Sequence, residues 1–487
     1  MLRIVTLLLF LAAYSWAAER PNIIFLLADD QTFDSLGCYG NEDVKTPNID
    51  QLSKDGLTFD HYYNTTAICM ASRANILTGL YEYRNGCNFG KGDLSQELFA
   101  QSYPMLLRDA GYVTAFAGKI GIEVDGVGLP EDSFDWWGAG PGQTSFDTKR
   151  NKSMAKYAEA YPHATRSYGA FGSDFVKWAQ EKDKPFCLSI SFKAPHRPVQ
   201  PDPEFDDVYA GKTFSKPANF GREAGAHFSE QSRQGRQFPR FEGWGYADNF
   251  DETLAKYHQL CYAIDVAVGM IREAVQESGA ADNTVIIYTS DNGYFNGAHG
   301  LGSKVLPYEE STRAPMIIFD PRKPEVAGRR TSSLAGNIDV APTILEMAGV
   351  EAPKELDGKS LVPLFENQKA KVHSSLALMN CWGPEAAQSF GLVTKSHKYI
   401  YWYFQNDEMQ PAEELYDLGV DRLELKNVID DDSEKTDRVR KLYDQQIEHL
   451  REHAKPKYEQ YGTLFDRHSA WDEKQELLPK KLTPAGK

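Results

Sequence analysis

The chain has 487 residues, of which 25% are charged and 41% hydrophobic, the ordinary composition of a globular protein. This length exceeds what one hydrophobic core usually holds, so we expect two domains. The formal net charge of -16 argues against a nucleic-acid partner and makes binding of a polyanion depend on local basic residues. Six cysteines are too few for a disulfide framework, and the lack of a CxxC pair argues against a zinc ribbon.

The first 18 residues are typical of a secretory signal peptide. Arg3 precedes an apolar run from residue 4 to residue 16, and Ala17 and Ala18 stand before a polar stretch. The run is too short to cross a bilayer comfortably, and no later run approaches the roughly 20 apolar residues of a membrane helix. We therefore expect a secreted or periplasmic protein with no membrane attachment beyond this signal; a retained N-terminal anchor is the alternative.

From residue 21 to about 350, short apolar runs alternate with helical patterns. This order is typical of an α/β fold, in which helices cover both faces of a mostly parallel sheet. Strands are predicted at residues 23–28, 112–117, 186–192 and 285–290, and helices from residue 47, over 105–110 and over 251–277. Residues 205–250 lack a clear period and are interpreted as a long surface insertion.

The pattern changes after about residue 365. A β-like stretch at 398–403 is followed by a charged helix predicted over 434–453, which indicates a small α+β domain with an antiparallel sheet. The predicted organisation is therefore a signal peptide at 1–18, a catalytic domain at 19–365 and a C-terminal domain at 366–487.

Polar side chains follow two of the predicted strands. Asp29 and Asp30 come after the first strand, and Asp291 and Asn292 follow the strand that ends at residue 290. Ligands of open parallel sheets bind at the carboxyl ends of strands, where three converging carboxylates would repel each other without a cation. Oxygen ligands favour Ca²⁺ or Mg²⁺. Either pair alone could equally be a helix cap or a turn.

A third element is Cys69-Met70-Ala71-Ser72-Arg73, which is followed by a short helical pattern and Thr78-Gly79. Here the chain resembles the formylglycine-dependent sulfatases, whose signature is Cys-x-Pro/Ala-x-Arg followed by a short helix and Thr-Gly. The resemblance extends over nearly the whole chain. It covers residues 22–30, 46–50, 118–119, 195–198, 290–293, 304–310 and 339–343, in the family's order.

The resemblance implies the fold of the alkaline phosphatase superfamily, a large mixed, mostly parallel sheet sandwiched by helices, with a small C-terminal domain. It implies sulfate ester hydrolysis with a sulfated carbohydrate as the expected substrate, one Ca²⁺ ion, and a formylglycine that a maturation enzyme makes from the cysteine. The implied metal ligands are Asp29, Asp30, Asp291, Asn292 and modified Cys69.

The resemblance also implies roles for basic residues. Arg73 would hold the hydrated aldehyde, Lys119 and Lys304 would clamp the sulfate, and His196 with Lys304 would protonate the departing oxygen. His299 is a further predicted substrate contact. Without the motifs, each of these lysines would be read as a surface residue and each histidine as a loop residue.

The chain departs from the family pattern at Gly121, where many relatives carry a histidine two residues after the motif lysine. Its role would pass to another group, with Glu123 and His299 as the candidates, or would be weaker. Ala71 stands where some maturation systems strongly prefer proline. Two other functions stay open: a phosphodiester or phosphonate monoester hydrolase of the same superfamily, and an inactive glycan-binding relative. The aromatic, arginine-rich stretch 228–244 could contact sulfated glycans or be structural.

Overall fold

An eight-stranded sheet forms the centre of the protein in the computed structural model, which describes residues 20–479. The neighbouring strands β5, β4, β6, β1 and β7 are all parallel, whereas β8 runs antiparallel to both β7 and β2. The predicted mixed, mostly parallel sheet is therefore confirmed. In sheet order the strands are β5 (Trp136–Gly140), β4 (Val113–Lys119), β6 (Phe186–Pro195), β1 (Asn22–Asp29), β7 (Thr284–Ser290), β8 (Met316–Phe319), β2 (Leu57–Phe59) and β9 (Arg329–Thr331).

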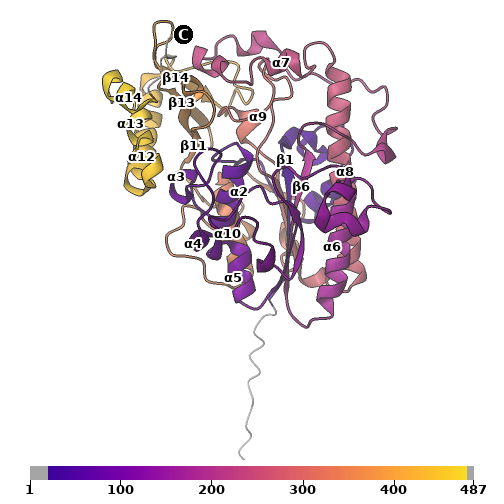
Figure 1. Cartoon of the computed structure of the whole chain (residues 1–487). Coiled ribbons are helices and arrows are strands. Elements are labelled where there is room, and N and C mark those ends of the chain that lie inside the picture. Colours follow the sequence, from indigo (N-terminus) through magenta and orange to yellow (C-terminus); the bar gives the residue numbers. More distant parts are fainter. Residues whose placement is uncertain (1–19, 480–487) are drawn as a thin grey trace, which may run out of the picture.

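Helices cover both faces of this sheet (Figure 1). One layer contains α1 (Pro47–Asp55), α6 (Ala164–Gln180) and α8 (Phe250–Glu277), and the other contains α2 (Cys69–Thr78), α5 (Tyr103–Asp109) and α10 (Val340–Met347). Every strand and helix predicted in this part of the chain is present, with ends that differ by a few residues.

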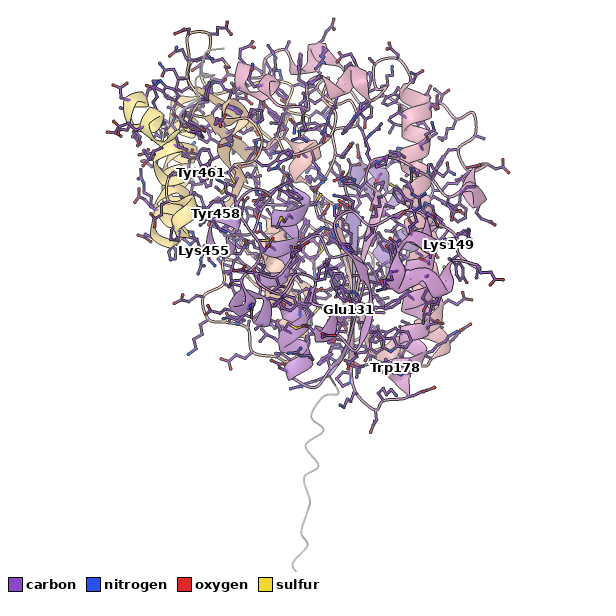
Figure 2. The ribbon with its side chains drawn as sticks, viewed as in Figure 1. Glu131, Lys149, Trp178, Lys455, Tyr458 and Tyr461 are labelled. Carbon is purple, nitrogen blue, oxygen red and sulfur yellow. The ribbon has the colours of Figure 1, made fainter. Side chains whose placement is uncertain are left out.

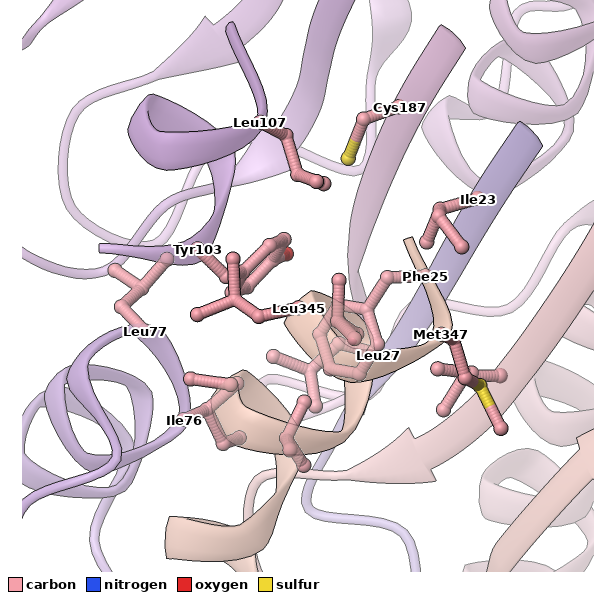
Figure 3. Packing of buried hydrophobic residues seen from close by; sticks show 14 of the residues in the cluster. Ile23, Phe25, Leu27, Ile76, Leu77, Tyr103, Leu107, Cys187, Leu345 and Met347 are labelled. Carbon is pink, nitrogen blue, oxygen red and sulfur yellow. The ribbon is translucent and has the colours of Figure 1, made fainter. Parts of the chain in front are cut away.

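Strand β1 explains why two layers are needed. It is buried along its whole length, and its side chains alternate between the two cores. Ile23, Phe25 and Leu27 pack into the core with Tyr103 and Leu345 from α5 and α10, as Figure 3 shows. The side chains of the intervening residues join the core under α6 and α8. An unbroken apolar run is what a strand covered on both faces requires.

The C-terminal part forms a four-stranded antiparallel sheet, as predicted. Its strands are β11 (Leu376–Asn380), β12 (Ser389–Val393), β13 (His397–Trp402) and β14 (Ala412–Asp417), and α12 (Ser433–His453) packs on it. Tyr458, labelled in Figure 2, donates a hydrogen bond of 2.8 Å to Glu82 of α3 (Glu82–Asn85) and so ties this part to the large sheet domain. The exact boundary at residue 365 stays a prediction.

The segment 205–250 is not a loose surface loop. It contains two short 3-10 helices, Arg222–Gly225 and Glu230–Gln234, and the short α-helix α7 (Arg240–Gly243), while Phe228, Phe241 and Tyr246 are buried. Its chain is irregular because it packs through scattered aromatic side chains and not through one periodic face.

All six cysteines are free thiols. The predicted signal peptide lies outside the described residues, and within 20–479 no helix combines the length and the apolar character needed to span a membrane.

Candidate active site

Cys69 is the first residue of α2, a ten-residue helix whose every residue is buried. Ile68 before it is extended, and Gly79 ends the helix in the left-handed region with φ 72°. This start points the Cys69 side chain to the carboxyl ends of β1 and β7. Its Sγ lies 3.4 Å from Oδ1 of Asp29 and 2.8 Å from Nζ of Lys304.

The polar residues that follow β1 and β7 meet, as the sequence predicted. Because Ala28 is the register partner of Ser290, the next residues lie side by side at this edge of the sheet: Asp29 ends β1 and Asp291 follows β7. The backbone N–H of Asp30 donates to Asp291 Oδ1 at 3.2 Å, and Asn292 Nδ2 donates to Asp30 Oδ1 at 2.7 Å. Asp29, Asp30, Asp291 and Asn292 are all at most 2% exposed.

Three cations balance the three carboxylates. Lys119, at the end of β4, places Nζ 2.6 Å from Asp29 Oδ2, and Lys304 is ion-paired with Asp30. Arg73, one helical turn after Cys69, places Nε 2.8 Å from Asp291 Oδ2 and donates to the Lys119 carbonyl. Charges buried this deeply are tolerated only when each is paired.

His196 lies at the edge of this cluster, directly after β6. Its Nε2 is 3.7 Å from Asp30 Oδ2, and 19% of its side chain is exposed. It is therefore the most exposed side chain of the cluster, and it faces the open side of the site. Burial lowers the pKa of His196, although Asp29 and Asp30 oppose this effect.

The charges of the cluster set its titration. Burial and the Asp29 charge raise the pKa of the Cys69 thiol to about 12, so the unmodified side chain is a neutral thiol near pH 7. Burial and Asp29 also raise the pKa of Asp291 to about 6. Burial would raise the pKa of Asp29 too, but the positive charges around it, Lys119 foremost, hold it well below 3.8. A neutral thiol is a poor nucleophile, so this cysteine is not suited to thiolate chemistry.

The donor set fits a hard cation. The Oδ1 atom of Asn292 is buried and has no hydrogen-bond partner, which leaves a carbonyl oxygen free beside the carboxylates. Ligand atoms of Asp29, Asp30, Cys69 and His196 all lie within 4.8 Å of one another. Asp291 is not in that group; its oxygens accept hydrogen bonds from Arg73 and from the Asp30 N–H. Oxygen donors in this number favour Ca²⁺ or Mg²⁺.

Gly121 lies against Arg73. Its φ is +73°, and a Cβ added there would come within 2.6 Å of Arg73 Cδ. The space beside the motif lysine is thus taken by the arginine stem. Glu123 is exposed, and neither it nor His299 lines the cavity above Cys69. The geometry gives no support to either residue as a replacement for the family histidine.

His299 lies in a different environment. Its ring is fully buried, with Nε2 3.1 Å from Asn219 Nδ2 and 3.5 Å from Glu310 Oε2. Although burial opposes it, the charge of Glu310 raises the pKa of His299. A direct substrate contact by His299 therefore finds no support in its position.

A cavity of about 870 Å³ opens above Cys69. Asp30, His196 and Lys304 line its deep end. Its upper wall includes residues to which the sequence motifs assigned no role: Arg197, Arg236, Arg240, Trp244 and Trp382. The composition of the stretch 228–244 hinted at three of them, whereas Trp382, after β11, carried no signal in the sequence.

Comparison with known proteins agrees with this geometry. Residues 21–350 match the family model described as Sulfatase, and residues 297–453 match the one described as N-sulphoglucosamine sulphohydrolase, C-terminal. The chain belongs to the sulfatase family. Its predicted family and enzyme class, a sulfuric ester hydrolase, are thereby confirmed.

Individual relatives show the extent of the similarity. This sulfatase is 30% identical to an N-acetylglucosamine-6-O-sulfatase of Bacteroides thetaiotaomicron, with 87% of each chain covered, and 28% identical to human arylsulfatase A, with 81% and 77% covered. A solved structure of a protein in complex with its substrate D-glucosamine-2-N,6-O-disulfate has a TM-score of 0.74 and 26% identity, and covers 89% of this chain and 99% of its own. A phosphonate monoester hydrolase of Agrobacterium radiobacter, at 22% identity and a TM-score of 0.71, shares the fold over 89% and 96% of the two chains.

Proposed function

We propose that this sulfatase removes sulfate esters from sulfated carbohydrates, using a formylglycine made from Cys69 and one Ca²⁺ ion. The observation that carries the proposal is the position of Cys69, at the start of a buried helix between two lysines and three strand-end carboxylates. The names of the similar glucosamine sulfatase and of the glucosamine disulfate complex support a sugar substrate.

The chain supplies the ligands for the metal. Asp29, Asp30, Asp291 and Asn292 would hold Ca²⁺ together with modified residue 69, and a cation there neutralises the carboxylates and attracts the sulfate oxygens. The formylglycine, as a hydrated aldehyde, would supply an oxygen nucleophile in place of a thiol that stays protonated.

The remaining side chains would bind and orient the sulfate group. Lys119 and Lys304 hold fixed positive charges on two sides of residue 69, where negative charge grows as the S–O bond breaks. Arg73 would keep residue 69 and Asp291 in place. His196 lies on the open side of the cluster and would give a proton to the departing sugar oxygen.

Burial of the deep end excludes water from the reacting atoms. Cys69 is 2% exposed and Lys304 is 7% exposed, so the charges around the sulfate would act in a medium of low dielectric. The same burial requires that a maturation enzyme reach Cys69 before folding is complete, and export by the predicted signal peptide fits this order of events.

The test combines chemistry and turnover. The protein would be produced together with a formylglycine-generating enzyme, and the mass of the tryptic peptide 55–73 would report conversion of Cys69. Calcium-dependent release of sulfate from an aryl sulfate should then appear and be lost in Cys69→Ala. The matched control, Cys38→Ala, changes a half-buried free thiol outside the site and should retain activity.

Two results would contradict the proposal. Full conversion of Cys69 without turnover of an aryl sulfate or of sulfated sugars would contradict the proposed sulfatase mechanism. Activity that survives Cys69→Ala would contradict the role of a formylglycine at this position. Rates on a phosphate diester and a phosphonate monoester, measured in parallel, test the alternative substrate class. If Cys69 in peptide 55–73 stays unmodified in wild-type protein produced with the formylglycine-generating enzyme, that result would favour the inactive glycan-binding alternative.

A further inference from the structure

Three arginines in the cavity wall have no acidic partner. Arg197, Arg236 and Arg240 all line the cavity, and none of them is ion-paired with a residue of the described chain, 20–479. Two other arginines, both in the insertion 205–250, do have acidic partners. Arg222 is paired with Glu242 at 2.5 Å and Arg233 with Glu230 at 2.6 Å, and neither lines the cavity.

Aromatic side chains hold the three arginines in place. The guanidinium groups of Arg240 and Arg197 lie 4.1 Å and 4.5 Å from the ring centroid of Trp244, and that of Arg236 lies 4.1 Å from the centroid of Trp382. Stacking of this kind orders a guanidinium group while its N–H donors stay free at the edge.

Each arginine lies next to a residue of the catalytic cluster. Arg197 directly follows His196. Arg240 donates from Nη1 to Ser303 Oγ at 2.9 Å, and Ser303 precedes Lys304. Trp382, whose ring stacks with the Arg236 guanidinium group, packs with Ile68, the residue before Cys69. The three positive charges therefore line the same cavity as Cys69, which a sulfate ester enters to reach residue 69.

Holding these charges together is unfavourable without an anion. Burial lowers the pKa of Arg240, and the charges of Arg236 and Arg197 lower it further. The cavity is lined by two acidic residues, Asp30 and Glu252. Asp30 is ion-paired with Lys304, and Glu252 is ion-paired with Lys256 at 2.6 Å, so neither neutralises the three arginines. The wall thus keeps an excess of positive charge in a protein whose formal net charge is -16.

We propose that Arg197, Arg236 and Arg240 form a second anion subsite, which selects saccharides that carry another negative group beside the sulfate ester that is cleaved. The proposal rests on the proposed function, since it assumes that the cleaved sulfate binds at residue 69. The second group is a sulfate or a carboxylate, because planar guanidinium groups bind both through paired N–H donors. The tryptophans would contact the apolar face of the sugar.

Substrate preference tests the proposal. The protein with formylglycine would be assayed on a hexosamine with one sulfate ester, on the same sugar with a second sulfate, and on the same monosulfated sugar joined to a uronic acid. We expect kcat/KM to be about tenfold or more higher for at least one dianionic substrate, the effect of a charge-assisted hydrogen bond. The two dianionic arms distinguish sulfate from carboxylate.

Variants locate the effect. Arg236→Gln and Arg240→Gln should each reduce the dianion-to-monoanion ratio of kcat/KM about tenfold. Arg233→Gln, three residues before Arg236 and paired outside the cavity, should leave the ratio unchanged. A wild-type ratio near one, or a ratio that neither cavity variant reduces, would overturn the proposal.

Binding separates this proposal from the proposed function. The affinities of the same sugars for full-length Cys69→Ala protein would be measured by calorimetry, which needs no turnover. At least tenfold tighter binding of a dianionic sugar, lost in the Arg236→Gln background, supports the subsite even if no sulfate is released. Turnover of an aryl sulfate together with equal affinity for all three sugars would sink the subsite and leave the sulfatase mechanism standing.

Discussion

Replacement of Gly121 by alanine should damage the catalytic cluster through Arg73. The added methyl group would meet Arg73 Cδ at 2.6 Å and Nε at 3.1 Å, and the backbone has φ +73°. Left-handed backbone costs an alanine about 1–2 kcal/mol relative to glycine. The clash adds about 1–3 kcal/mol, because Arg73 is buried and tied to Asp291 and to the Lys119 carbonyl, so it cannot simply turn away.

A matched glycine separates these two costs. Gly279, just after α8, has φ +74° but nothing within 4 Å of the added Cβ. Gly279→Ala should therefore lose only about 1–2 kcal/mol of unfolding free energy, whereas Gly121→Ala should lose about 2–5 kcal/mol. Activity should differ even more, since a shift of Arg73 by a few tenths of an ångström or more moves its contacts with Asp291 and Lys119 and would cost about tenfold to a hundredfold in kcat.

The assay is urea unfolding of both variants together with kcat and KM on an aryl sulfate. Equal unfolding free energies in the two variants, with full activity in Gly121→Ala, would refute the reasoning. It would mean that Arg73 can be displaced without consequence and that Gly121 is not required by packing.

Three further predictions concern charge. Lys398 is fully buried between Glu309 at 2.8 Å and Glu424 at 3.0 Å, so Lys398→Met should lower the unfolding free energy, measured in urea, by about 3–5 kcal/mol. Lys177→Met breaks an exposed pair with Glu277 and should lower it by less than about 1 kcal/mol. Equal losses in the two variants would contradict the argument. Burial raises the pKa of Asp265 to about 6, above its ordinary value of 3.8, so between pH about 4 and 6 the folded state binds more protons than the unfolded state and stability falls as pH rises. Asp265→Asn should remove about 1–3 kcal/mol of this decline when the unfolding free energy is measured across that pH range. The same decline in the variant as in the wild type would contradict this prediction. Chelation of divalent cations should abolish sulfate release and lower the melting temperature, and added Ca²⁺ should restore both. Asn292→Ala should make the melting temperature depend less on Ca²⁺. A melting temperature that does not change with Ca²⁺ would contradict the proposed ligand set.

Much of the fold was readable from local pattern. The apolar run of β1, the proline-started helix α1 and the long amphipathic α8 each carry their signal within one segment, because burial on one or both faces fixes which positions must be apolar. The strand-end residues Asp29 and Asp291 were also placed correctly at one edge, since parallel neighbouring strands end together. The roles assigned to the site residues stay predictions.

Other features depended on contacts between distant segments. No local pattern predicted that Gly121 lies against Arg73, that His299 is buried with Glu310, or that Trp382 of the C-terminal part joins the wall above Cys69. The insertion 205–250 has no period to read, because aromatic residues at irregular spacing along it gather into one cluster, which also includes Leu254 and Tyr294. Sequence thus determined the elements, the strand-end chemistry and the family motifs, whereas tertiary packing alone decided which cations face the substrate cavity, since that depends on side-chain pairings across long stretches of chain.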